Sequence, residues 1–188
     1  MAKRALDQIL VVDVESTCWQ GPAPAGQVSE IIEIGVCPLD IATLEPQAPR
    51  ALMVRPTRSE ISAFCTELTT ITATDVEGAP TLGEACAVLR QEFNSRNRYW
   101  ASFGDYDRHQ FKRNCSDLGI GYPFSTRHLN VKSLFSLVRG LKREVGMARA
   151  LELSGIELSG THHRGVDDAF NIAKLLAQLL AASREEAT

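Results

Sequence analysis

The chain lacks the features that assign a sequence to several specialised classes of protein. No apolar run approaches the roughly 20 residues that cross a bilayer, so we expect no membrane association. The first predicted strand follows the N-terminal residues too soon for a secretory signal. Internal repeats, low-complexity tracts and interdomain linkers are also missing. We therefore expect one domain over residues 1–188, with a core at about 9–182 and a polar tail at 183–188.

An excess of positive charge is missing as well. The formal net charge is −3, which argues against a protein that coats long duplexes through counterion release. It is compatible with an enzyme that holds a few nucleotides of a single strand. A small-molecule α/β enzyme finds no support either, because the sequence has no glycine-rich phosphate loop.

Cysteine is present, but without the CxxC spacing of a metal-binding motif. The nearest two cysteines are 19 residues apart, and the total of five is odd. Free thiols in a reducing cytoplasm are the expected state of Cys18, Cys37, Cys65, Cys86 and Cys115.

The stretch 10–17 carries the first chemical signal. Leu10 to Val12 is a short apolar run typical of a buried strand, and Asp13 and Glu15 follow at alternate positions. Alternate residues of a strand point to the same side, so the two carboxylates would converge. Their repulsion and lost hydration are costly, and a hard divalent cation would relieve both. The alternative is that both carboxylates face water where the strand ends.

The remaining pattern favours an α/β fold with a mixed sheet. Further strands are predicted at 30–36, 51–54, 99–103 and 128–130, the first three strands forming a meander. Helices are predicted at 82–93, from 107 to about 118, at 134–141, at 145–153 and at about 167–182. The segment 55–80 is predicted to be mostly irregular. The helix after the fifth strand is indicated by Leu134, Val138 and Leu141. The last helix has a predicted buried stripe of Ile172, Leu175, Leu176, Leu179 and Leu180.

Two later segments add acidic residues at predicted helix starts. Asp105 and Asp107 lie where a strand gives way to a helix, and Asp167 and Asp168 open the last helix. Asp at a helix N-terminus also serves as a cap or dipole partner, and we assign that role to Asp167. Taken together, Asp13, Glu15, Asp107, His163 and Asp168 form a set that could bind metal and move a proton.

This set resembles the DEDDh 3′→5′ exonucleases, whose fold is similar to ribonuclease H. The resemblance rests on Asp13-x-Glu15, a later Asp at a strand-to-helix turn, and His163-x4-Asp168, in that order, and extends from about Ile9 to Leu180. It implies a mixed five-stranded sheet flanked by helices. The segment Phe64-x3-Leu68-Thr69-x-Ile71-Thr72 is most similar to the Eri-type and histone-mRNA exonuclease branch.

Two assignments had an alternative. Asp107 follows an aromatic residue and precedes Phe111 by four positions, as in the Eri-like branch, and Asp105 is the runner-up. His163 fits the five-residue step to Asp168. His162 with Asp167 fits the same step, but the apolar stripe of the last helix places position 168 toward the core.

The resemblance implies a two-metal phosphodiesterase using two Mg²⁺ or Mn²⁺ ions. Asp13 would bridge the ions, Glu15 and Asp168 would complete the first site, and Asp107 would hold the second. His163 would be the general base, since an imidazole accepts a proton near neutral pH.

The resemblance also implies residues that bind the substrate. Ser16 and Thr17 would hold the 3′ hydroxyl, and Phe64, Leu68 and Tyr106 would enclose the terminal base. Basic side chains near the acidic set, those of Arg108, Lys132 and Arg164, could contact phosphates.

The leading hypothesis is a metal-dependent 3′→5′ exoribonuclease that releases nucleoside monophosphates from single-stranded RNA. The alternatives are a DNA 3′→5′ exonuclease of the proofreading or repair type, and a nucleic-acid-binding scaffold without catalysis. The sequence does not indicate the oligomeric state.

Overall fold

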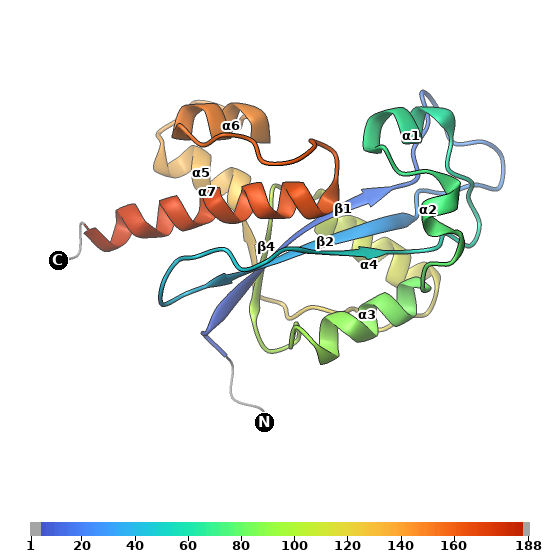
Figure 1. Ribbon diagram of the computed structural model, residues 1–188, viewed down its shortest axis with the longest axis horizontal. Coiled ribbons are helices and arrows are strands. Elements are labelled where there is room, and N and C mark those ends of the chain that lie inside the picture. Colours follow the sequence, from blue (N-terminus) through green and yellow to red (C-terminus); the bar gives the residue numbers. More distant parts are fainter. Residues whose placement is uncertain (1–4, 186–188) are drawn as a thin grey trace.

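A five-stranded mixed sheet forms the centre of the molecule. The structure, a computed structural model, describes residues 5–185 (Figure 1). Strand order is β3-β2-β1-β4-β5, with β1–β2 and β2–β3 antiparallel and β1–β4 and β4–β5 parallel. The strands are β1 (Gln8–Ser16), β2 (Ile31–Asp40), β3 (Arg50–Met53), β4 (Tyr99–Ser102) and β5 (His128–Asn130). The mixed sheet and the initial meander are confirmed.

Helices cover both faces of this sheet (Figure 1). One face packs against α5 (Val131–Val138), α6 (Met147–Ser154) and α7 (Gly165–Glu185). The other packs against α3 (Leu82–Gln91) and α4 (Tyr106–Asp117). Two short helices, α1 (Ala63–Thr69) and α2 (Ala73–Glu77), enclose a third, smaller apolar cluster.

The alternation of side chains along β1 places the acidic pair. Ile9 and Val11 pack in the apolar cluster on the α7 side, whereas Leu10 and Val12 pack on the α3–α4 side. Since alternate positions share a face, Asp13 and its neighbour at position 15 continue the row toward α7. The predicted convergence thus follows from the two-residue period of one strand.

The first turn of α7 lies directly on β2. A Cβ atom added to Gly35 would lie 1.9 Å from the Gly165 carbonyl oxygen, so only glycine allows this approach. The predicted stripe of α7 is confirmed for Ile172, Leu175 and Leu176, which are fully buried. The helix is therefore fixed both by its apolar stripe and by the glycine contact at its N-terminus.

Two predictions about helices were wrong. The segment 55–80 contains α1 and α2, which begin at caps rather than at an apolar repeat: Ser62 Oγ accepts from the Cys65 N–H, and Thr72 forms a capping box with Asp75. The helix predicted at 134–141 begins three residues earlier, as α5, whose buried face carries Val131 and Phe135 while Val138 is exposed.

The C-terminal prediction was partly wrong. Residues 183–185, predicted as tail, belong to α7, and 186–188 lie outside the described residues. All five cysteines are free thiols. Within residues 5–185 no helix is long and apolar enough to cross a membrane.

Candidate active site

Carboxylates from separate segments meet in one pocket at the end of β1. Oxygen atoms of Asp13, Glu15 and Asp168 lie within 4.8 Å of one another. The pocket has a volume of about 360 Å³, and Asp107 also lines it. The predicted acidic set is therefore brought together from β1, α4 and α7.

Asp107 is held by the strand that it faces. Pairing of β1 with β4 ends at Val11, which leaves the backbone of residue 14 without a partner on that side. The Val14 N–H donates to Asp107 Oδ1 at 3.0 Å, and only 4% of Asp107 is exposed. The runner-up, Asp105, is exposed and accepts a hydrogen bond from Asn130. The geometry favours Asp107, as predicted.

Crowding and burial make ionisation of the cluster unfavourable. Burial raises the pKa of Glu15 to about 8, and the carboxylates of Asp168 and Glu33 add to the rise. Burial raises the pKa of Asp107 to about 6, a rise that the Val14 N–H limits. The pKa of Asp13 is also raised, by burial and then by Asp107 and Glu15. The site therefore holds protons that a bound cation would displace.

Two adjacent imidazoles lie beside Asp168 and line the pocket. His162 Nδ1 lies 3.2 Å from both carboxylate oxygens of Asp168, whereas His163 donates its backbone N–H to Oδ2 at 3.0 Å. The two rings stack with centroids 4.0 Å apart. The sequence paired His163 with Asp168, but it is the ring of His162 that contacts this carboxylate. His163 has a positive φ of 66°, and a ring nitrogen of His163 lies within 4.8 Å of a carboxylate oxygen of Asp168.

A buried ion pair holds the N-terminus of α7. Glu33, which is fully buried, accepts from Arg164 Nε and Nη2 at 3.2 and 3.3 Å, and from the Gly165 N–H at 3.0 Å. The guanidinium fork on one carboxylate is a strong, oriented contact. Arg164 is thereby engaged inside the protein, which argues against the predicted phosphate contact.

Only some of the residues that were predicted to bind the substrate line the pocket. Ser16, Leu68 and Tyr106 line the pocket, whereas Phe64 and Thr17 do not. The sequence interpretation missed three residues that line the pocket, Val14 of β1, Phe103 after β4 and Met147 at the start of α6. Apolar residues at element ends gave no signal that distinguishes pocket lining from core.

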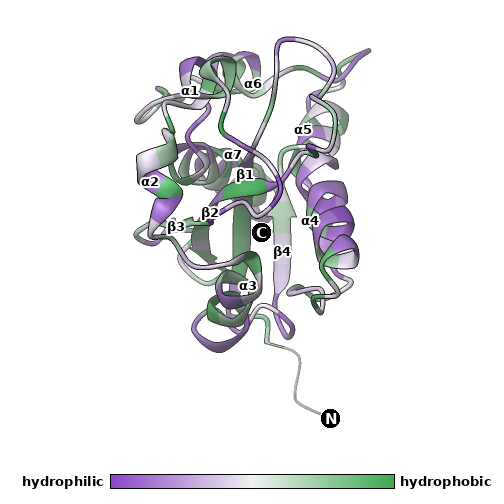
Figure 2. Ribbon diagram, turned by 90° about the vertical axis from the view of Figure 1, so that its right-hand side faces the viewer, coloured by the Kyte–Doolittle hydropathy of each residue, from purple (hydrophilic) through white to green (hydrophobic). Residues whose placement is uncertain are grey.

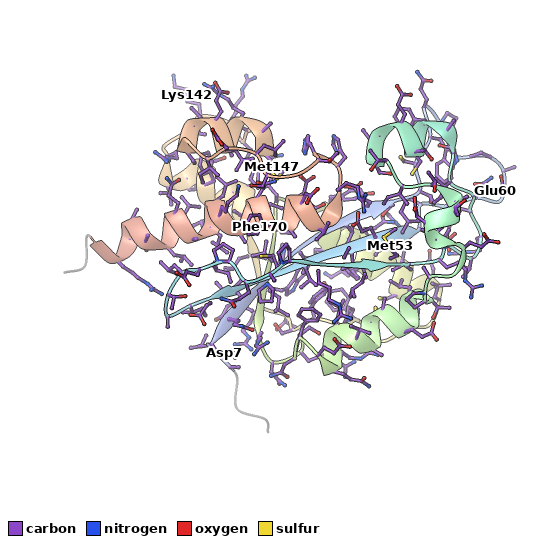
Figure 3. All side chains as sticks on the ribbon, in the orientation of Figure 1. Asp7, Met53, Glu60, Lys142, Met147 and Phe170 are labelled. Carbon is purple, nitrogen blue, oxygen red and sulfur yellow. The ribbon has the colours of Figure 1, made fainter. Side chains whose placement is uncertain are left out.

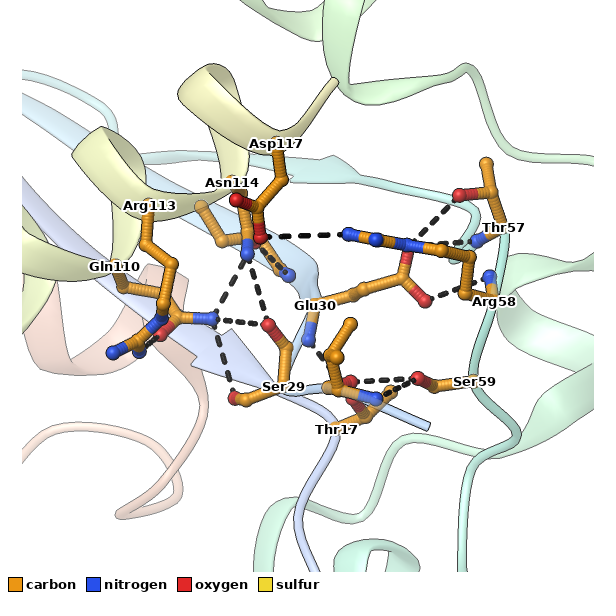
Figure 4. Close-up of polar contacts among 12 residues, drawn as sticks. Thr17, Ser29, Glu30, Thr57, Arg58, Ser59, Gln110, Arg113, Asn114 and Asp117 are labelled. Carbon is orange, nitrogen blue, oxygen red and sulfur yellow. Dashed lines mark hydrogen bonds and ion pairs between the residues drawn. The ribbon is translucent and has the colours of Figure 1, made fainter. Parts of the chain in front are cut away.

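Thr17 belongs to a polar network whose labelled residues do not line the pocket (Figure 4). Its hydroxyl donates to the Val28 carbonyl and accepts from the Glu30 N–H, and its side chain is fully buried. Glu30 in turn accepts from the backbone of Thr57 and Arg58. These contacts engage the Thr17 hydroxyl inside the protein and argue against its predicted contact with a 3′ hydroxyl. The residue fixes the connection between β1 and β2.

Comparisons with known proteins relate this arrangement to nucleases. An exonuclease family model (RNase_T) matches residues 10–176. The 3′-5′ exoribonuclease 1 of Homo sapiens is 30% identical over 184 residues, which cover 93% of this chain and 52% of that protein. The 3′-5′ exonuclease Snipper of Drosophila melanogaster is 26% identical over 202 residues, with coverages of 96% and 72%. The chain thus spans about half the length of exoribonuclease 1.

Solved structures share the fold. The nuclease domain of 3′hExo, described as a DEDDh family member bound to rAMP, superposes with a TM-score of 0.82 at 27% identity, covering 96% of this chain and 95% of that one. A 3′-exonuclease structure described as recognising the 3′ end of a histone mRNA stem-loop gives a TM-score of 0.83 at 27% identity, with coverages of 97% and 66%. The ribonuclease H-like fold implied by the sequence is confirmed.

Proposed function

Because the chain belongs to the exonuclease family whose model matches residues 10–176, we propose that it is a 3′→5′ exoribonuclease that releases nucleoside 5′-monophosphates from single-stranded RNA. The observation that carries the proposal is the convergence of four carboxylates from β1, α4 and α7 in one pocket. Relatives named as exoribonucleases favour RNA over DNA. Its five free thiols are compatible with the cytoplasm, which we propose as its location.

The residues present fit divalent metal ions, on which DEDDh exonucleases depend. Oxygen ligands suit hard cations such as Mg²⁺ and Mn²⁺, and the mutual repulsion of the carboxylates would be neutralised by such charge. Asp13, Glu15 and Asp168 would hold one ion, and Asp107 beside Asp13 would hold the second. When bound, two ions activate water and stabilise the leaving oxygen in phosphodiester hydrolysis.

His163 is the proposed general base. Burial and the neighbouring His162 ring hold the pKa of His163 below its ordinary value, so the imidazole is neutral at pH 7 and can accept a proton. The ring of His162 instead contacts Asp168, and we assign it the positioning of that carboxylate.

The walls of the pocket suit the end of a strand. Leu68 on α1 and Tyr106 on α4 are partly exposed at its rim, where an apolar edge and an aromatic ring can enclose a terminal base without reading its sequence. Ser16 Oγ is buried and has no hydrogen-bond partner within residues 5–185, and we propose that it binds the terminal ribose.

One experiment tests the activity. Labelled single-stranded RNA and DNA are incubated with the protein and Mg²⁺ or Mn²⁺, with and without EDTA. We expect 5′-mononucleotides from RNA, loss of activity in EDTA, and resistance of a circular strand and of a 3′-phosphate end. The Asp13→Asn protein is the control for a contaminating nuclease. Full activity in EDTA, or cutting of the circle, would refute the proposal, and preference for DNA would shift it to the DNA exonuclease.

A further inference from the structure

A second cavity lies beside α4, separate from the carboxylate pocket. It has a volume of about 160 Å³ and shares no lining residue with that pocket. Arg108 and Lys112, one turn apart on α4, form one side of it. Trp100 of β4 and His128 of β5 form its most buried part, and Tyr122 completes the aromatic lining. The ring of Trp100 contacts both aromatic neighbours, with centroids 4.2 Å from His128 and 6.5 Å from Tyr122.

This cavity offers hydrogen-bond donors and no carboxylate. Of the remaining lining residues, Thr126 carries a hydroxyl group, whereas Ser125 already donates its hydroxyl hydrogen to the Arg98 carbonyl. Trp100 is fully buried, and its Nε1–H has no acceptor among the described residues. Leaving a buried N–H unpaired costs about 1–3 kcal/mol, and native structures rarely do so without a reason. A ligand that accepts hydrogen bonds would use this donor.

The charge around the cavity is positive and little neutralised. Lys112 is exposed and forms no ion pair within residues 5–185. Arg108 has only a distant partner, with Nη1 3.8 Å from Asp105 Oδ1. Figure 2 shows α4 as a largely hydrophilic helix, and both cations belong to it. Burial and the charge of Arg108 lower the pKa of His128 to about 4, and Lys112 acts in the same direction against the opposing carboxylate of Asp105, which lies 3.8 Å from His128 Nδ1.

We propose that this cavity binds a phosphate group of the polynucleotide whose 3′ end occupies the carboxylate pocket. The proposal rests on the proposed function for its choice of ligand. Asp107 lines the pocket and Arg108 lines the cavity, and their Cα atoms are only about 3.8 Å apart along the chain. The first turn of α4 therefore contributes residues to both the carboxylate pocket and the cavity. A phosphate contact there would position the strand without reading its sequence.

The first test uses inorganic phosphate and does not depend on nuclease activity. The protein in EDTA is titrated while its two indole N–H resonances are followed by NMR, and Trp19→Phe assigns that of Trp100. We expect a saturable shift of the Trp100 signal and an affinity at least about threefold weaker for Lys112→Ala. The control is Lys142→Ala, which removes an exposed lysine between α5 and α6 (Figure 3) that lines neither cavity. Absence of a saturable shift would overturn the site.

The second test separates a polynucleotide from a free anion. Binding of a short single-stranded RNA is measured in EDTA at several salt concentrations. Loss of one phosphate contact should flatten the slope of log K against log salt by about 0.7 in Lys112→Ala, and Lys142→Ala should keep the parental slope. In turnover, the KM for long RNA should rise relative to that for a dinucleotide only in Lys112→Ala.

The two tests together distinguish a polynucleotide site from a site for free anions. Phosphate binding at Trp100 with equal salt slopes in the two lysine variants would show a site for free anions and refute the polynucleotide ligand. A flattened slope with RNA that is never hydrolysed would support the site while refuting the proposed nuclease.

Discussion

At the scale of single residues, the two candidate acids of the middle segment differ in burial and in contacts. Asp107 is buried against Val14, whereas Asp105 is exposed on the other side of the turn. Asp107→Asn keeps the size of the side chain but removes the charge, so we expect kcat to fall by about 10³-fold or more, equivalent to roughly 4 kcal/mol. Asp105→Asn should stay within about tenfold of the parent. Steady-state hydrolysis of RNA measures both, and the reverse ranking would place the metal ligand at Asp105.

The adjacent imidazoles allow a second prediction. If His163 is the general base, His163→Ala should lower kcat by about 10²–10⁴-fold. Binding of divalent ions, measured by calorimetry, should persist in this variant. The parent should lose activity on the acid side as the imidazole protonates, and in His163→Ala this limb should flatten. His162→Ala should have the smaller effect, because the ring of His162 contacts Asp168 and is proposed to position this carboxylate rather than to accept a proton. A larger loss in His162→Ala would exchange the two roles.

The sequence predicted those site residues whose placement follows from a local period. Asp13 and Glu15 converge through the alternation of one strand, and Asp168 through the phase of one helical stripe. The orientation of His163 depends on a left-handed backbone conformation, and the burial of Thr17 on partners more than ten positions away. Neither leaves a local pattern, so neither could be predicted from spacing.

At the scale of elements, the site depends on how closely α7 approaches β2. A methyl group at Gly35 would meet backbone atoms of Gly165, and backbone cannot rotate away as a side chain can. We expect Gly35→Ala to lose more stability than the about 1–3 kcal/mol typical of overpacking. Any folded fraction should have a reduced kcat because Asp168 is displaced. Urea unfolding measures the loss.

Gly78 provides the matched control, because an added Cβ meets nothing within 4 Å there and its φ is negative. Gly78→Ala should change stability by no more than about 0.5 kcal/mol. Equal stability of the two variants would contradict the close packing of α7 on β2.

Elements with a long apolar repeat were predicted better than short ones. The long strands β1 and β2 and the helix α7 were recognised because many of their residues are apolar and buried together. The helices α1 and α2 have only seven and five residues, too few for a repeat, and side-chain caps at Ser62 and Thr72 hold them. Such helices are stabilised by their tertiary setting, which a sequence period does not record.

At the scale of the whole molecule, the enclosed carboxylates couple folding to pH. In the unfolded chain Glu15 titrates near 4.5, whereas in the metal-free fold its pKa is about 8. Between these values the folded state holds a proton that the unfolded state has released, so the free energy of unfolding falls as pH rises. Asp107, raised from 3.8 to about 6, acts in the same direction over a lower range.

We therefore expect metal-free protein to lose stability, on the order of a few kcal/mol, as the pH rises from 5 to 8, as measured by urea unfolding in EDTA. Divalent ions should restore more stability at pH 8 than at pH 5, because a cation favours the ionised carboxylates and binds only the folded state. Glu15→Gln has no proton to release and should show a smaller decline with pH, a smaller gain from Mg²⁺ or Mn²⁺, and less activity. The same cluster that would bind metal thus destabilises the empty fold. If the stabilities of Glu15→Gln and the parent depended equally on pH, the Glu15 carboxylate would not be the source of this destabilisation.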